Sequence, residues 1–183
     1  MELIWALVIL VAVVAMWLIL TYNNLIRSKN RVEEAWSDIE VQMKRRYDLI
    51  PNLINTVKGY AKHEEGVFTK VTQARTAAMS ASSMKDHAKA ENMLSETLKS
   101  LFAVSENYPQ LQASDNFLQL QHELTDAEDK IMASRRFYNA NTRDFNTKLQ
   151  VFPTNLIAGT FGFKSREFFD APDVALETPV VKF

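Results

Sequence analysis

Residues 3–20 read LIWALVILVAVVAMWLIL, an uncharged and strongly apolar run at the start of the chain. A helix rises 1.5 Å per residue, so about 20 such residues cross the roughly 30 Å hydrocarbon core of a bilayer. A helix also satisfies its own backbone hydrogen bonds inside lipid. Trp5, Trp17 and Tyr22 stand towards the two ends of the run, where aromatic side chains prefer the interface. The run therefore predicts a single membrane-spanning helix, with residues 1–22 as an anchor.

The residues on either side of this run indicate whether it is cleaved and how it is oriented in the membrane. A cleaved signal peptide would need a basic leader, a shorter apolar run and a cleavage site between small residues, and these features are absent. We therefore expect residues 1–22 to stay attached in the mature protein. Glu2 precedes the run, whereas Arg27, Lys29 and Arg31 follow it. The positive-inside rule then predicts a single-pass protein with its N-terminus outside and its body in the cytoplasm.

Beyond the apolar run, apolar residues recur at alternating steps of four and three, as in a coiled coil. This seam has two polar exceptions and consists of Leu25, Lys29, Val32, Trp36, Ile39, Met43, Arg46 and Ile50. Pro51 removes a backbone donor, so we expect a kink or a restart there, and Gly66 is expected to end the helix. The pattern predicts that the first helix of the body continues directly from the membrane helix.

Three further helices are predicted in the body. They cover residues 67–81, residues from about 86 until Asn107, and residues 114–150. The last has a seam of its own, with polar layers at Ser134 and Asn141: Phe117, Leu120, Leu124, Ala127, Ile131, Ser134, Tyr138, Asn141 and Phe145. The fold class is therefore all-α, a transmembrane helix that continues into an up-and-down four-helix bundle over residues 23–150.

Residues 151–183 differ in character, because residues 152–169 hold five of the eleven phenylalanines. This stretch is too apolar to remain free in water, and Pro153, Gly159 and Gly162 break its helical pattern. We expect an irregular aromatic tail near the membrane-proximal end. It would pack on the bundle, on a neighbouring subunit or on the lipid surface, where Lys164 and Arg166 could meet anionic lipid.

The composition and the motifs of the chain indicate neither catalysis nor metal binding. The chain has no cysteine, and its 21 basic residues nearly balance its 22 acidic residues, so a nucleic-acid partner is not expected. Neither the spacing of a di-iron site nor that of a metalloprotease surrounds His63, His87 or His122. No phosphate loop, nucleophile elbow or catalytic triad order is found. We therefore predict no catalytic, cofactor-binding or metal residues. The acidic cluster Asp126, Glu128 and Asp129 and the basic residues 44–46 are read as solvated faces or as an ion-pair network between helices.

Several long motifs resemble the LemA family. They are YNNLIRSKNRVEEAWSDIEVQMKRRYDLIPNLINTVKGYAKHEEG at residues 22–66, FLQLQHELTDAEDKI at 117–131, RRFYNANTRDFNTKL at 135–149 and FPTNLIAGTFGF at 152–163. The resemblance implies a bacterial membrane protein with one N-terminal span and an up-and-down four-helix bundle. It brings no known catalytic residues, and we read residues 45–48 and Arg135-Arg136 as structural ion-pair positions. Some members of the family accompany membrane-bound metalloproteases, and a magnetosome-associated protein is related.

These observations lead to a main functional hypothesis and an alternative. The first is a membrane-anchored, non-enzymatic helical scaffold that self-associates as a homo-oligomer at the bacterial cytoplasmic membrane. The alternative is a regulatory adaptor or sensor for a membrane protease or a signalling pathway. The expected partners are the lipid bilayer, further copies of the chain and a membrane protein such as a protease, with no cofactor. An enzyme is a third class, which the missing catalytic motifs disfavour.

Overall fold

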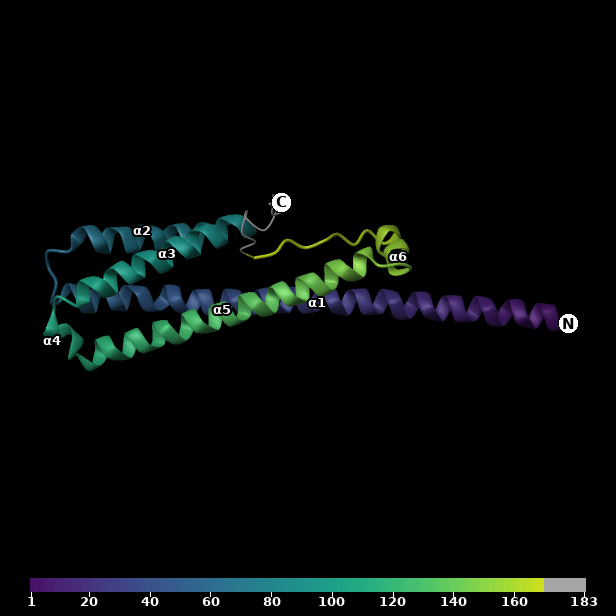
Figure 1. Cartoon of the computed structure of the whole chain (residues 1–183), viewed down its shortest axis with the longest axis horizontal. Helices are drawn as coiled ribbons and strands as arrows, with labels where there is room; N and C mark the ends of the chain where they lie inside the picture. The colour runs from purple at the N-terminus through teal and green to yellow at the C-terminus, as the bar shows by residue number, and fades with distance from the viewer. Residues whose placement is uncertain (170–183) are drawn as a thin grey trace, which may run out of the picture. The chain divides into compact units, whose positions relative to one another are not determined.

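The structure, a computed structural model, describes residues 1–169, and this part of the chain is helical with no strand. Its six helices are, in order, α1 (Glu2–Lys58), α2 (Glu65–Ser80), α3 (Met84–Ser105), α4 (Pro109–Gln112), α5 (Asp115–Gln150) and α6 (Thr154–Thr160) (Figure 1). The all-α prediction is confirmed for this range. Residues 170–183 of the predicted tail lie outside the described residues, and the division of the chain at residues 22 and 150 stays a prediction.

Helix α1 contains the apolar run and continues without interruption into residues 23–58. Within the described residues it is the one helix long and apolar enough to cross a membrane, and no residue of its most apolar stretch is buried. The helix therefore meets the length and composition expected of a span, and it is continuous with the seam as predicted.

Helix α1 does not restart at Pro51, because it runs through this residue to Lys58. Proline lacks a backbone N–H and so leaves the carbonyl one turn earlier, that of Tyr47, without its helical partner. Arg75 of α2 replaces it by donating a hydrogen bond from Nε to the Tyr47 oxygen at 2.7 Å. Pro51 itself is exposed, so its ring displaces no core side chain. The helix tolerates the proline because a side chain from another helix supplies the missing donor.

The predicted helix end at Gly66 is wrong. Helix α1 ends at Lys58, and the amides of Gly59 and Tyr60 turn back to the carbonyls of Thr56 and Val57. Gly66 instead lies in the first turn of α2. Because the chain turns at Gly59, α2 begins at Glu65 as a separate helix and buries its own apolar stripe.

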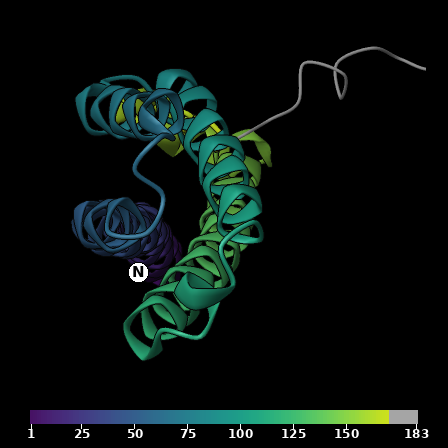
Figure 2. The ribbon, with the colours of Figure 1, turned by 90° about the vertical axis from the view of Figure 1, so that its left-hand side faces the viewer.

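The described residues form two compact units. The second unit comprises Asp38–Arg135 with Phe168 and Phe169, and takes part of α1, all of α2, α3 and α4, and part of α5. Helices α2 and α3 pack against each other within it (Figure 2). Ser83 caps α3 by accepting a hydrogen bond from the Asp86 amide at 3.1 Å. Its core contains the predicted seam positions Ile39, Met43, Ile50, Phe117, Leu124, Ala127 and Ile131.

The first unit comprises Met1–Ser37 and Arg136–Glu167. Here α1 and α5 meet through the rings of Trp36 and Tyr138, whose centroids are 5.8 Å apart. Lys148 of α5 also donates a hydrogen bond to the Ser28 hydroxyl of α1 at 2.6 Å. The seam positions Leu25, Val32, Tyr138 and Phe145 are buried as predicted.

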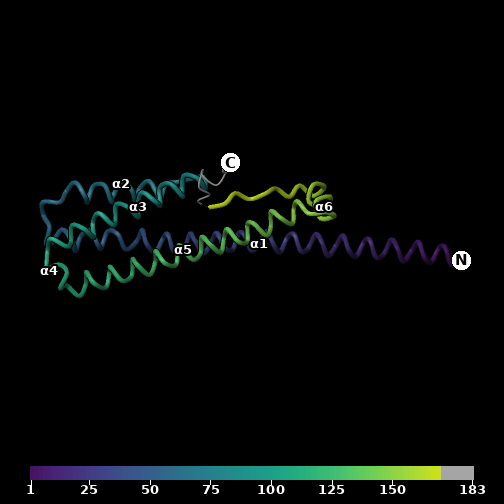
Figure 3. The backbone as a smooth tube through the Cα atoms, in the orientation of Figure 1, coloured from purple at the N-terminus to yellow at the C-terminus, as the bar shows by residue number. Residues whose placement is uncertain are grey.

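The expectation of a wholly irregular tail is wrong, because α6 forms within it (Figure 3). Pro153 stands directly before the helix, and proline suits a helix start. Ile157 and Ala158 are buried against Leu25 of α1, so tertiary packing stabilises a helix that is too short to form alone. Of the three surfaces considered for the tail, its own chain is the one on which this part packs.

Candidate functional site

A buried charge network lies in the second unit and joins α1, α3 and α5. At its centre Arg46 of α1 pairs with Glu91 of α3, and both side chains are 0% exposed. Arg46 also donates hydrogen bonds to Glu128 of α5 and, at 3.0 Å, to Ser95 of α3. Ser95 in turn donates to Glu128 at 2.9 Å. One guanidinium thereby binds side chains from two other helices.

Two more residues complete this network. The Tyr47 hydroxyl donates a hydrogen bond to Glu91. The Arg135 Nη2 atom lies 3.9 Å from the Glu91 carboxylate, and the guanidinium carbon is 4.5 Å from the centre of the Phe169 ring. Glu91 and Glu128 supply two negative charges, which Arg46 and Arg135 balance. The network is therefore close to neutral as a whole.

Burial perturbs the ionisation of this network. It lowers the pKa of Arg46, and the neighbouring Glu128 carboxylate opposes that shift. It raises the pKa of the Tyr47 hydroxyl, which the positive charges of Arg46 and Arg135 partly offset. Arginine does not lose its proton in proteins, so the guanidinium stays charged and needs its carboxylates. Arg46 and Glu91 have no exposed surface, so this central pair can fix helices in register.

A second, partly exposed set of ion pairs includes the neighbouring Arg45. Arg45 contacts Asp126 at 2.7 Å and Lys130 contacts the same carboxylate at 2.9 Å. Hydrogen bonds from Lys130 and Arg45 lower the pKa of Asp126. The interpretation of the basic and acidic clusters as an ion-pair network between helices is confirmed for Arg45, Arg46, Asp126 and Glu128.

Other predicted positions lie elsewhere. Lys44, Asp48, Asp129 and Arg136 are exposed. Conversely, the sequence analysis did not identify Glu91. Glu91 lies three residues after buried Ala88 and three before buried Leu94, and this spacing was the available signal.

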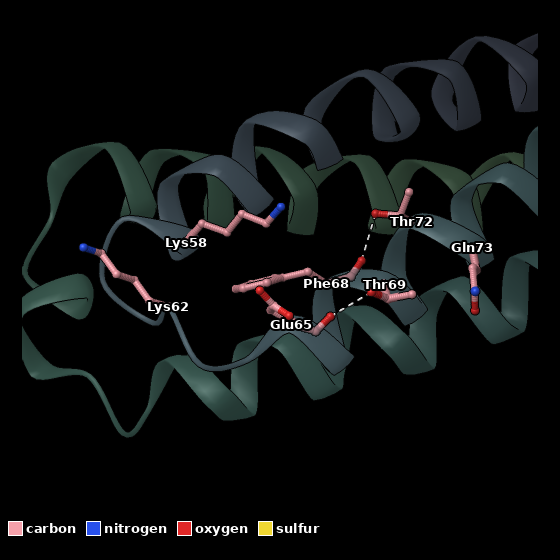
Figure 4. A pocket seen from close by; sticks show the side chains of 7 residues that line it. All are labelled: Lys58, Lys62, Glu65, Phe68, Thr69, Thr72 and Gln73. Atoms are coloured by element: carbon pink, nitrogen blue, oxygen red, sulfur yellow. Dashed lines mark hydrogen bonds between the residues drawn. The ribbon is translucent and has the colours of Figure 1, made fainter.

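An open groove of about 550 Å³ also lies in the second unit (Figure 4). It is lined by Lys58, Lys62, Glu65, Phe68, Thr69, Thr72 and Gln73. The two lysine side chains reach in different directions, and Lys58 lies 5.4 Å from the centre of the Phe68 ring. Thr69 and Thr72 donate their hydroxyl protons to carbonyls of their own helix. The groove therefore presents no convergent set of catalytic groups.

The histidines do not gather into a site. His63 and His122 are exposed, and His87 is half-buried. Within residues 1–169, no group of three or more histidine, aspartate or glutamate side chains could hold a metal ion.

Comparison with known proteins identifies several related sequences. Residues 35–183 match the sequence profile of the LemA family. The chain is 29% identical over 153 residues to "Protein LemA" of Metamycoplasma hominis, an alignment covering 83% of this chain and 70% of that protein. It is 25% identical over 190 aligned positions to "Magnetosome protein MamQ 2" of Paramagnetospirillum magneticum and 24% identical to "Magnetosome protein MamQ" of Magnetospirillum gryphiswaldense. Both of these alignments cover 90% of this chain and 70% of the relative.

Proposed function

Because the chain belongs to the LemA family, we propose that it is a membrane-anchored, non-enzymatic helical scaffold that self-associates at a bacterial membrane. One observation carries this proposal. The other described residues leave the apolar run of α1 uncovered, and the same helix continues unbroken into the body. A bilayer stabilises such an apolar run by burying it in hydrocarbon. Because the helix is continuous, the position of the span also sets the position of the body.

The proposed orientation places the body in the cytoplasm. Arg27, Lys29 and Arg31 follow the span, whereas Glu2 is the charged side chain before it. Positive residues near a span are retained on the cytoplasmic side. The body is proposed to be an up-and-down four-helix bundle of α1, α2, α3 and α5. Hydrogen bonds from Arg46 to α3 and α5, and from Arg75 to α1, support this arrangement.

The proposal of a non-enzymatic role rests on the buried network. Its opposite charges pair with each other, and its central pair has no access to solvent. Active sites usually combine perturbed ionisable groups with an accessible cleft. A reproducible turnover that is lost on changing one of these carboxylates would contradict the proposal.

Self-association is supported by apolar side chains of α5 that are partly exposed. Leu118 and Met132 are 48% and 44% exposed, and they lie two heptads apart on the same face of the helix. A matching face of a second copy would cover them, as in a coiled coil. The test is the mass of the full chain in mild detergent together with cross-linking in native membranes. A monomer in both would contradict self-association, and replacing both residues with glutamine should weaken the oligomer.

The second candidate function is an adaptor for another membrane protein. The open groove beside Lys58 and Phe68 supports it, because an adaptor needs a surface for a ligand or a partner segment. Affinity capture of the cross-linked full chain, followed by mass spectrometry, separates the two functions. Recovery of this chain alone supports the scaffold, whereas a stoichiometric second membrane protein supports the adaptor.

A further inference from the structure

A second groove, of about 340 Å³, lies in the first unit and combines aromatic rings with cations. Its aromatic wall is formed by rings from α1, from α5 and from the segment after α6. The ring centroid of Tyr22 is 4.9 Å from that of Phe161 and 5.9 Å from that of Phe163, and Phe145 is 6.5 Å from Phe163. These rings support one another, so the wall is a packed surface.

The polar part of this groove is positively charged. Lys29, Lys164 and Arg166 line it, and the lining residues of the described chain include no carboxylate. Glu33, just outside, contacts Arg166 at 2.7 Å and Lys29 at 3.7 Å. Three positive charges and this one negative charge give the groove and its edge a net charge of +2. An anion is therefore the ligand that the groove favours.

The groove is also held in shape. The Asn146 side chain of α5 makes two hydrogen bonds to the Arg166 backbone, donating to the oxygen at 2.8 Å and accepting from the amide at 2.9 Å. Tyr138 donates to the Glu167 carbonyl at 2.9 Å. Gly162 turns the chain with φ of 69°, a conformation that favours glycine. Lys164 and Arg166 are thus positioned by backbone that is fixed to α5.

The groove begins close to the end of the membrane span, near the layer of lipid headgroups. Tyr22 comes two residues after the apolar run, and Lys29 comes seven residues later in the same helix. At 1.5 Å per residue, Lys29 lies roughly 10 Å beyond Tyr22. The polar layer on each side of a bilayer is about 5–8 Å thick. Tyr22 then lies in this layer, and the long Lys29 side chain must reach back towards the bilayer to meet it.

Apolar side chains of the groove and of the segment that precedes it are exposed among the described residues. Phe161, Leu156 and Phe152 are 59%, 61% and 79% exposed. Helix α6 is nevertheless held in place, because Ile157 and Ala158 pack on Leu25. Apolar groups at this level, next to cations, are typical of segments that lie in the interface of a membrane.

We propose that this groove binds the phosphate of an anionic phospholipid from the bilayer that α1 enters. Lys29 and Lys164 contact the phosphate, Arg166 adds positive charge while it pairs with Glu33, and Phe161 packs on the upper acyl chain. This inference rests on the proposed function, because it requires α1 to span a membrane. In this proposal, lipid and not a second copy of the chain covers the exposed aromatic side chains of the groove.

The test uses the full chain in nanodiscs that contain equal amounts of phosphatidylcholine and phosphatidylglycerol. Native mass spectrometry then identifies the lipids that stay bound when the protein is released. The wild type should retain phosphatidylglycerol preferentially, and Lys164→Gln should reduce this preference about fivefold, the effect of one cation near a charged surface. The matched control is Lys99→Gln, an exposed lysine on α3, which should leave the preference unchanged.

A second variant tests the sign of the effect. Glu33→Gln removes the negative charge beside the groove and should raise the preference for phosphatidylglycerol. Thermal melts of each variant verify that the fold is retained. Equal retention of the two lipids by the wild type, an unchanged preference in Lys164→Gln, or an equal loss in Lys99→Gln would overturn the proposal.

Two further outcomes are informative about the source of the anion and about the anchor. If millimolar inorganic phosphate abolishes the preference, the groove binds the free anion and the assignment to lipid is wrong. If the full chain does not enter nanodiscs at all, the proposed span fails. Insertion without lipid preference leaves the span intact and overturns the groove alone.

Discussion

Replacing Arg46 with methionine should destabilise the protein strongly. Arg46 and Glu91 are both 0% exposed, so the substitution leaves a buried carboxylate without its main partner. Breaking a buried pair in this way costs about 3–5 kcal/mol. Tyr47 still donates to Glu91, Arg135 remains 3.9 Å away, and methionine preserves much of the apolar stem. These compensations place the expected loss near the lower limit, about 3 kcal/mol.

The adjacent arginine provides a matched control. Arg45 contacts Asp126 at 2.7 Å, but the two side chains are 39% and 34% exposed. Exposed ion pairs contribute about 0–1 kcal/mol, so Arg45→Met should cost less than about 1 kcal/mol. The assay is urea unfolding of the full chain in mild detergent, followed by far-ultraviolet circular dichroism at neutral pH. For Arg46→Met, the corresponding fall in the melting temperature is about 6–12 °C.

A double variant separates the charge from the packing. In the Arg46→Met background, Glu91→Gln replaces the stranded carboxylate with a neutral amide and should recover about 1–2 kcal/mol. Equal losses for the two arginine variants would refute the reasoning. So would a double variant no more stable than Arg46→Met alone, because the cost would then arise from packing.

Three further predictions concern packing, backbone conformation and pH. Ile39 is 0% exposed and Val41 is 60% exposed, so Ile39→Ala should cost about 2–5 kcal/mol and Val41→Ala less than about 0.5 kcal/mol in the same urea assay. Gly162→Ala should cost about 1–2 kcal/mol in thermal melts, because φ is 69° there, whereas Gly159→Ala in α6 should not destabilise; equal effects would contradict this reading. Burial raises the pKa of Tyr47, so its neutral form is favoured in the folded state. This contribution is fully present below about pH 10 and is lost as the pH rises through the higher folded value. Urea midpoints should therefore fall above about pH 10, and Tyr47→Phe should flatten part of that fall.

Much of the fold could be predicted because it depends on periodicity along single helices. The apolar run needs only length and composition to indicate a span. The seams around Ile39 and Ile131 follow from heptad spacing, and both residues are buried as expected. Local patterns of this kind are visible wherever neighbouring residues in the sequence are also neighbours on a helix face.

The candidate site was only partly predictable for the same reason. The arginines at 45 and 46 and the acids at 126 and 128 were recognised as charges that could pair between helices. Glu91 was not, because a single carboxylate in an apolar stripe does not show which distant residue will neutralise it. Its partner Arg46 lies 45 residues earlier in the chain.

By itself, the sequence determined the helical class, the uncovered apolar run and the apolar face of each long helix, since each depends on residues within a few turns of one another. Only the tertiary structure decided which polar groups are satisfied. Arg75 supplies the donor that Pro51 lacks, and so keeps α1 continuous. Leu25 buries Ile157 and Ala158, and so makes a helix of a stretch that reads as irregular. In each case the deciding contact joins residues more than 20 positions apart, and its energy exceeds the local preference that the sequence displays.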